Sequence, residues 1–258
     1  MIDSFAGIIV LGANGFIGKQ ILRFLSETHN VRGFSKPDFD ITNPETYPIA
    51  DLDRMLIIDC IARINGAQEE IERVNIEGFE QFLTFLQTHN FTGKYIYLST
   101  LSVLKPSLVL TNTYVESKAK AEDLLKQKIQ NYQIIRLAFP IGSGQSAERL
   151  IPRLIRQLRM NEDIYIDDVR LNITPVEAIL DNLEAILFSN LKEVNFTDGK
   201  EYTLEDICRK LSILTGSLSQ IHIRTDKIVD ITFSPSLDVK SFEPFLLQTL
   251  SKMSHENI

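Results

Sequence analysis

The feature that most constrains the fold is an alternation of short apolar runs with amphipathic stretches across residues 7–142. The apolar runs are GIIVLGA at 7–13, NVRGFS at 30–35, MLIIDCIA at 55–62, KYIYLST at 94–100 and YQIIRLAF at 132–139. Helical periodicity is clearest at 16–27, 66–89 and 114–130. Buried strands that alternate with helices are typical of a parallel sheet with helices on its faces. The sequence therefore predicts an α/β chain with a doubly wound parallel sheet.

After Gly142 the alternation becomes less regular. We expect helices at 146–160, 174–189 and 203–216, short strands at 163–168 and 193–198, and short strands with loops over the last forty residues. These segments predict two domains. The first is a sheet domain over residues 1–165 with a return segment at about 172–199, and the second is a small C-terminal lobe over 200–258.

Composition narrows the classes of function. The 258 residues are 44% hydrophobic and 24% charged, which is ordinary for a soluble globular protein. The net charge of −7 and the pI near 5.2 argue against a nucleic-acid-binding protein. Two cysteines and four scattered histidines form no disulfide framework and no metal-ligand spacing, so we expect a cytoplasmic protein without a metal site. We see no signal peptide and no long apolar run, and therefore expect no membrane association.

A glycine-rich turn follows the first apolar run. LGANGFIG at 11–18 contains Gly12, Gly15 and Gly18. Such a turn between a strand and its helix lets a pyrophosphate approach the backbone and lie at the helix N-terminus. The spacing is G-x-x-G-x-x-G, not the G-x-G-x-x-G of typical dehydrogenases, and a turn without a ligand is the alternative. Its position at the first strand–helix turn favours dinucleotide binding.

TYVESKAKAE at 113–122 places Tyr114 four residues before Lys118. Four residues are about one helical turn, so both side chains project from one face of the expected helix. One interpretation is an acid/base pair, because a nearby cation makes a phenol easier to ionise. The other is a packed tyrosine beside a solvated lysine.

The glycine turn, the tyrosine–lysine pair and YLST at 97–100 together resemble the extended short-chain dehydrogenase/reductase family. This family contains nucleotide-sugar epimerases, dehydratases and reductases. The resemblance covers about residues 5–215 and implies a Rossmann-type sheet with a small C-terminal substrate lobe. Three further segments resemble the family. VNIEGFEQFL at 74–83 would put Asn75 beside the active site, and RLAFPIG at 136–142 would line the nicotinamide pocket. NITPVEAI at 172–179 would return the chain to the sheet domain.

The resemblance also implies catalytic roles. Tyr114 corresponds to the general acid/base, and Lys118 to the residue that lowers its pKa and binds the nicotinamide ribose. Thr100, three residues before Val103, corresponds to the hydroxyl that polarises the substrate carbonyl. The segment between Thr100 and Tyr114 is shorter than in most of the family, where it covers part of the sugar, and Leu104 replaces an aromatic residue.

We expect NADP(H) to be favoured over NAD(H). Family members that use NAD usually end the second strand with an Asp that binds both ribose hydroxyls. Here Ser35 and Lys36 follow that strand and resemble the Thr-Arg of NADPH-using fucose synthases. Lys36 would meet the 2′-phosphate, and Asp40 with Ile41 would cap the adenine edge, whereas a solvated loop lysine is the alternative for Lys36. The other cofactor-binding residues that the resemblance implies are Gly12, Asn14, Gly15, Phe16, Ile17, Gly18, Ile61, Ala62, Arg63, Asn75, Ser99, Tyr114, Lys118, Pro140 and Ile141.

The residues after Thr100 discriminate among reactions. The family's dehydratases have an acidic pair there, and the fucose-type epimerase/reductases have a Cys where Ser102 stands, whereas this chain has Leu101 and Ser102. Simple 4-ketoreduction and 4-epimerisation remain, and NADP(H) favours net reduction. We therefore predict an NAD(P)H-dependent reductase of a 4-keto nucleotide sugar. A 4-epimerase and a non-catalytic NAD(P)-binding regulatory protein are the alternatives, the latter because of the short 101–113 loop.

The substrate-binding candidates are Ser102, Arg149, Arg153 and Arg170. Arg149, Arg153 and Arg156 recur at helical spacing, which fits either a solvated basic face or a clamp for the diphosphate of a nucleotide sugar. Arg170 lies near the position of the family's diphosphate-binding arginine. The resemblance also implies a homodimer, in which the helices near 66–89 and 113–130 form a four-helix bundle with a second subunit.

Overall fold

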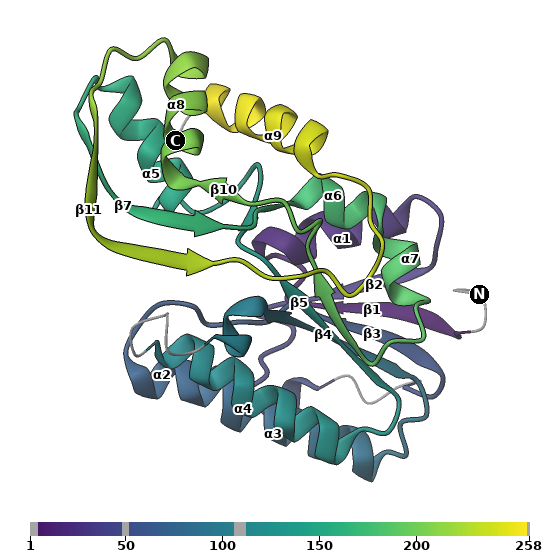
Figure 1. The fold of residues 1–258 in the computed structure, drawn as a ribbon. Coiled ribbons are helices and arrows are strands. Elements are labelled where there is room, and N and C mark those ends of the chain that lie inside the picture. The colour runs from purple at the N-terminus through teal and green to yellow at the C-terminus, as the bar shows by residue number, and fades with distance from the viewer. Residues whose placement is uncertain (1–4, 48–51, 106–111, 257–258) are drawn as a thin grey trace. The chain divides into compact units, whose positions relative to one another are not determined.

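The computed structural model describes residues 5–47, 52–105 and 112–256. Its central element is a six-stranded sheet with the order β2-β1-β3-β4-β5-β9 (Figure 1). Strand β1 pairs in parallel with β2 and β3, and β3 pairs in parallel with β4. The strands are β1 (Gly7–Leu11), β2 (Val31–Phe34), β3 (Met55–Asp59), β4 (Lys94–Thr100), β5 (Tyr132–Leu137) and β9 (Glu193–Phe196). The predicted α/β class with a Rossmann-type sheet is confirmed.

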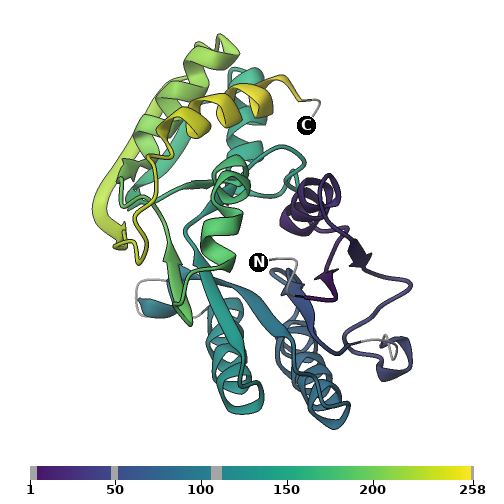
Figure 2. The same cartoon turned by 90° about the vertical axis from the view of Figure 1, so that its right-hand side faces the viewer.

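Helices cover both faces of this sheet, because its central strands are apolar on both sides. All five residues of β3 are buried, as are four of the five in β1. Helix α1 (Phe16–Ser26) lies on one face, and α3 (Phe79–Thr88) and α4 (Thr113–Lys128) lie side by side on the other (Figure 1 and Figure 2).

The strand order reverses at β1. Strand β2 lies on one side of β1 and β3 on the other, so the connections leaving the ends of β1 and β3 diverge. In open α/β sheets ligands bind at the carboxyl ends of the strands beside such a reversal. The glycine-rich turn after β1 and residues 60–63 after β3 are both at this edge.

The helix predicted near 66–89 contains a π-helical segment. Helix α2 (Gln68–Glu72) continues through the π-helix η3 (Arg73–Gly78) into α3. The spacing of the apolar residues is consistent with a π-helix, because Val74 and Phe79 are five residues apart rather than the three or four expected in an α-helix. Asn75 and Gly78 are buried within this segment.

The chain forms two compact units. The first comprises Met1–Arg136 and Leu183–Val194, and the second comprises Leu137–Asn182 and Asn195–Ile258. Each unit has its own hydrophobic cluster, the first around Phe79, Phe82 and Tyr95 and the second around Leu158, Ile207 and Leu250.

These units differ from the predicted division at 165 and 200. Residues 137–182 group with the C-terminal segments because their apolar side chains belong to the second cluster. The assignment of functional domains stays a prediction.

The second unit contains a three-stranded sheet with the order β10-β7-β11 and a two-stranded sheet of β6 and β8. Strand β7 pairs in parallel with β11 and antiparallel with β10. The strands and helices of the second unit are β6 (Pro140–Ile141), α5 (Leu150–Arg159), β7 (Ile164–Leu171), β8 (Thr174–Pro175), α6 (Val176–Asp181), β10 (Tyr202–Thr203), α8 (Leu204–Thr215), β11 (Ile221–Ile231) and α9 (Glu243–His255).

Two expectations for the later segments were wrong. The last forty residues are not short strands and loops, since they contain the eleven-residue strand β11 and the thirteen-residue helix α9. The single helix expected at 174–189 is divided into α6 and α7 (Leu183–Leu187), because the chain leaves the helical conformation at Asn182. The expected end of α8 at Gly216 is confirmed, since Gly216 has the left-handed conformation of a helix cap.

The helices of the described residues include none that is both long and apolar enough to cross a membrane. The same residues contain no group of three or more His, Cys, Asp or Glu side chains placed to hold a metal ion.

Candidate active site

The glycine-rich turn between β1 and α1 is tightly packed. Gly12 has a φ of +71°, and a Cβ there would lie 3.1 Å from backbone atoms of Cys60 and Ile61. A Cβ on Gly18 would collide with the carbonyl oxygen of Gly12. Side chains at these two positions would therefore displace the backbone, which explains the glycines physically.

The N-terminus of α1 is open to an anion. Gly15 is its N-cap, no side chain caps the helix, and no acidic residue lies in its first turn, which includes Phe16, Ile17 and Gly18. Uncapped N–H groups and the helix dipole attract negative charge, so this end is suited to a phosphate.

The segment after β2 is fixed by polar contacts. The backbone N–H of Asn14 donates to Ser35 Oγ at 2.8 Å, so Ser35 braces the glycine turn. Lys36 Nζ lies 2.7 Å from Asp40 Oδ2 while the lysine side chain is 68% exposed. Asp40 Oδ1 accepts hydrogen bonds from the backbone and hydroxyl of Thr42 at 3.0 and 2.9 Å. Burial raises the pKa of Asp40, but hydrogen bonds from Lys36 and Thr42 outweigh it and hold the pKa below its usual value.

Asn75 joins three elements. Its Oδ1 accepts from the backbone N–H of Arg63 at 2.8 Å, and its Nδ2 donates to the Arg63 carbonyl and to Ser117 Oγ, both at 2.9 Å. The π-helix thus ties the loop after β3, which carries Ile61, Ala62 and Arg63, to α4. Arg63 itself makes an ion pair with Glu70 at 2.7 Å.

The tyrosine–lysine pair lies in the first turns of α4. Asn112 caps this helix by accepting the backbone N–H of Tyr114 at 3.0 Å. Tyr114 is half-buried, whereas Lys118 is only 1% exposed and its Nζ lies 3.8 Å from the centre of the Tyr97 ring. Burial lowers the pKa of Lys118 to about 8, and the nearby Asp59 and Glu122 act in the opposite direction. Lys118 is therefore no solvated surface lysine.

Thr100 ends β4, against which α4 packs. Its Oγ1 accepts the backbone N–H of Ser102 at 3.3 Å and so caps the 3₁₀-helix η4 (Leu101–Leu104). This is the only hydrogen bond of the Thr100 hydroxyl within the described residues. The neighbouring Ser99 is buried, and its Oγ has no hydrogen-bond partner in the described part of the chain. Residues 106–111 of the shortened loop lie outside the described residues.

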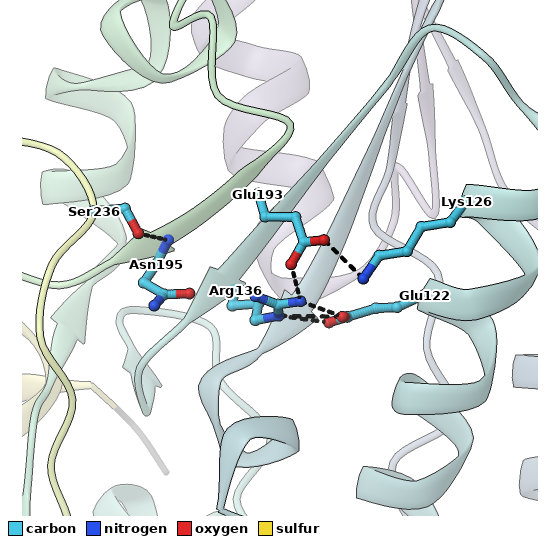
Figure 3. Close-up of polar contacts among 6 residues, drawn as sticks. All are labelled: Glu122, Lys126, Arg136, Glu193, Asn195 and Ser236. Carbon is cyan, nitrogen blue, oxygen red and sulfur yellow. Dashed lines mark hydrogen bonds and ion pairs between the residues drawn. The ribbon is translucent and has the colours of Figure 1, made fainter.

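Sequence reasoning missed four buried polar side chains near α4. Asp59 and Tyr97 come from β3 and β4, Glu122 lies one turn after Lys118, and Arg136 comes from β5. Figure 3 shows Arg136 between Glu122 and Glu193, with distances of 2.5 and 2.6 Å from its Nη2. An ionisable residue inside an apolar strand, such as the Asp of MLIID, is the signal that could have found them.

The remaining candidates belong to the second unit. Pro140 and Ile141 form β6, Arg149 is the N-cap of α5, Arg153 is exposed on that helix and Arg170 is exposed on β7. Neither these three arginines nor Arg156 forms an ion pair with any part of the chain that the structure describes.

Comparison with known proteins gives one family match. The model of the NAD dependent epimerase/dehydratase family matches residues 8–187. A search of curated proteins gives no match.

Many solved structures share the fold. RMD from Pseudomonas aeruginosa, solved with NADPH, has a TM-score of 0.79 at 18% identity, covering 98% of this chain and 100% of that one. TunA, an NAD-dependent NDP-hexosamine 5,6-dehydratase, has a TM-score of 0.78 at 17% identity, with 97% and 98% covered. UDP-glucose 4-epimerase from Thermotoga maritima has a TM-score of 0.78 at 15% identity, with 96% and 97% covered.

The family match covers most of the chain and confirms the predicted relationship to the extended short-chain dehydrogenase/reductases. It also confirms the prediction of an NAD(P)-dependent enzyme.

Proposed function

Because this chain belongs to the NAD dependent epimerase/dehydratase family, we propose that it is an NAD(P)H-dependent reductase of a 4-keto nucleotide sugar. The observation that carries the proposal is the placement of Thr100, Tyr114 and the buried Lys118 at the junction of β4 and α4. A hydroxyl donor, a phenol and an ammonium group are what the reduction of a ketone requires of the protein.

The residues fit a nicotinamide cofactor. Gly12 and Gly18 leave no room for side chains, the N-terminus of α1 is uncapped, and Ser99 has a buried hydroxyl without a partner among the described residues. The first two features suit a pyrophosphate and the third suits a polar group at the reactive end of the cofactor. The bound cofactor supplies a hydride to the carbonyl carbon of the substrate.

The chain's own groups handle the oxygen and its proton. The Thr100 hydroxyl donates a hydrogen bond to the carbonyl oxygen and polarises it. The Tyr114 hydroxyl transfers its proton to that oxygen as negative charge develops there, so the ketone becomes an alcohol. Lys118, held beneath Tyr114 on the same helical face, keeps a positive charge near the resulting phenolate and meets the ribose hydroxyls.

Lys36 supports NADP(H) as the preferred cofactor. Its side chain is 68% exposed, with the ammonium group paired to Asp40, and the residue lies two positions after the end of β2, where the 2′-phosphate of an adenosine ribose would be placed. RMD, of similar fold, was solved with NADPH. The predicted role of Asp40 at the adenine edge stays a prediction, as do the cofactor roles of Ile41, Ile61, Ala62, Asn75, Pro140 and Ile141.

A 4-epimerase is the second candidate. Asp40 already pairs with Lys36, and an acid after the second strand is the group that binds ribose hydroxyls in NAD enzymes. The Thermotoga maritima structure of similar fold is a UDP-glucose 4-epimerase. Reduction is favoured because β2 ends at Phe34 and the next two residues are Ser35 and Lys36, neither of which is an acid.

For the substrate, Arg149, Arg153 and Arg170 are proposed to bind the diphosphate, and Ser102 the sugar. The proposed cytoplasmic homodimer would use α3 and α4. No large hydrophobic side chain is exposed on either helix, so such a contact would be polar. A monomeric mass by light scattering at micromolar concentration would remove the dimer.

The experiment is a single-turnover assay of purified protein with NADPH and a panel of 4-keto nucleotide sugars. Tyr114→Phe removes the proton donor and should slow hydride transfer by on the order of 10²–10⁴ while NADPH binding is nearly unchanged. Tyr132→Phe, on β5, is the matched control and should react at the unmodified rate. If Tyr114→Phe also reacts at the unmodified rate, the catalytic assignment is wrong. If NADPH binds but no panel member is reduced or epimerised, a regulatory NAD(P)-binding protein is the better description.

A further inference from the structure

We propose that Asp59 is a positioning residue of the active site, whose buried carboxylate supplies the counter-charge that keeps Lys118 protonated. Asp59 ends β3 and Lys118 lies on α4, and each side chain is 1% exposed. The inference rests on the function proposed for Lys118, but it concerns a residue that no part of that function used.

The hydrogen bonds of Asp59 leave its charge unbalanced. Its Oδ1 accepts from the backbone N–H of Ile61 at 2.8 Å, and its Oδ2 accepts from the hydroxyl of Tyr95 at 2.7 Å. Both donors are neutral. They satisfy the geometry of the carboxylate, but a buried ion also needs an opposite charge nearby. Burial raises the pKa of Asp59, and the charge of Lys118 opposes that rise.

The surroundings of Lys118 are similarly incomplete without Asp59. Its ammonium lies over the face of Tyr97, which attracts a cation but carries no net charge. Asp59 of β3 is the direct register partner of Tyr97 in the parallel pair of β3 and β4, so Asp59 is a neighbour of the ring over which Lys118 lies. The acids whose charges act on Lys118 are this Asp59 and Glu122 of its own helix. Cys60 also lies near, but burial raises the pKa of its thiol, so it is neutral near pH 7.

Glu122 already forms an ion pair with Arg136. Arg136 Nε donates to its two carboxylate oxygens at 2.9 and 3.2 Å, and Nη2 donates at 2.5 Å (Figure 3). The two side chains are 4% and 7% exposed, so this pair balances itself. Asp59, which neighbours Tyr97 and forms no ion pair with another residue that the structure describes, is the acid left to balance Lys118.

Asp59 and Lys118 would therefore have different roles in the site. Asp59 fixes the protonation state of Lys118, and Lys118 acts on Tyr114 and on the cofactor ribose. Asp59→Asn keeps the size of the side chain, and its amide oxygen can still accept from Ile61, but the charge is removed. Lys118 would then be a buried cation whose remaining acidic neighbour, Glu122, is already paired with Arg136, and it would lose its proton at lower pH.

The direct test follows the Lys118 side-chain NMR signal with pH in the cofactor-free full-length protein, using Lys118→Met to assign it. We expect a midpoint near pH 8 in the unmodified protein and a midpoint lower by on the order of one pH unit or more in Asp59→Asn. Asp123→Asn, an exposed acid on α4, is the matched control and should leave the midpoint unchanged.

Two further measurements close the test. In Lys118→Met the carboxyl of Asp59 should titrate at a higher pH than in the unmodified protein, which gives an answer even if Asp59→Asn does not fold. NADPH affinity in Asp59→Asn should fall with rising pH at a lower midpoint than in Asp123→Asn. If both reciprocal titrations stay in place, the proposal is overturned. If the titrations shift while no variant, nor the unmodified protein, binds NADPH, the pairing stands and the proposed function fails.

Discussion

Replacing Arg136 with Met should destabilise the first unit far more than its single side chain suggests. Arg136 lies between Glu122, whose side chain is 4% exposed, and Glu193, whose side chain is 38% exposed (Figure 3). The substitution leaves Glu122 as a buried carboxylate that has lost its ion-pair partner. Lys126 pairs with Glu193 at 2.7 Å and so keeps that outer acid compensated.

The magnitude follows from burial. Removing one partner of a buried ion pair costs about 3–5 kcal/mol, whereas an exposed pair contributes about 0–1 kcal/mol. We therefore expect Arg136→Met to lower the free energy of unfolding by about 3–5 kcal/mol. Glu193→Gln keeps the inner pair and should cost about 1 kcal/mol or less. The double variant Arg136→Met/Glu122→Leu removes both inner charges and should recover most of the loss.

Urea unfolding at pH 7, followed by circular dichroism, measures these differences. The informative comparison is between the single and the double variant, because both lack the arginine and only the single one retains the inner acid. A double variant as unstable as Arg136→Met would refute the reasoning, since the cost would then come from lost packing around the arginine stem and not from an uncompensated Glu122.

Three further outcomes are expected. Lys36→Ala should weaken NADPH binding by roughly 1.5–3 kcal/mol with little effect on NADH, and equal affinities of the unmodified protein for both cofactors, by fluorescence titration, would retract the NADP assignment. Gly18→Ala should weaken binding of both cofactors, as measured by calorimetry, because its methyl group collides with the Gly12 carbonyl and moves the turn. The third concerns pH. Because the pKa of Lys118 is lowered to about 8 in the folded state from 10.5, the unfolded chain holds more protons between those values, so this group's contribution to stability rises with pH there, by at most about 1.4 kcal/mol per unit. NADPH affinity should fall as the pH rises through this range, because Lys118 loses its charge. In Lys118→Met, the pH dependence of stability and that of NADPH affinity should both be smaller.

The sheet was predictable because its signals are local. Each strand of the first unit is a short apolar run bounded by turn residues, and the glycine turn needs only neighbouring backbone to form. Helix α9 was missed although a signal existed, since Pro244 stands in its first turn and Leu246, Leu250 and Met253 repeat at helical spacing. The division between the units was not predictable, because it depends on which apolar faces find each other across long stretches of chain.

The site was predictable only where a motif is contiguous. Thr100, Tyr114 and Lys118 lie close together in the sequence, so a family sequence pattern identifies them. Asp59 lies far from Lys118 along the chain, and only the adjacency of β3, β4 and α4 brings the two charges together. Spacing in the sequence carries no record of that adjacency.

The buried charges of the first unit form an ordered series of opposite signs. The charge of Asp59 favours the protonated form of Lys118, and Glu122 follows Lys118 one helical turn later. Arg136 then forms ion pairs with both Glu122 and Glu193. An isolated ion at one of the four buried positions, Asp59, Lys118, Glu122 or Arg136, would cost several kcal/mol, whereas a cation and an acid in alternation lower one another's cost. The buried Glu122–Arg136 pair also fixes α4 to β5. The same interactions that make the burial of Lys118 possible therefore hold the helix that presents Tyr114, so substitutions along the series should change stability and the titration of Lys118 together.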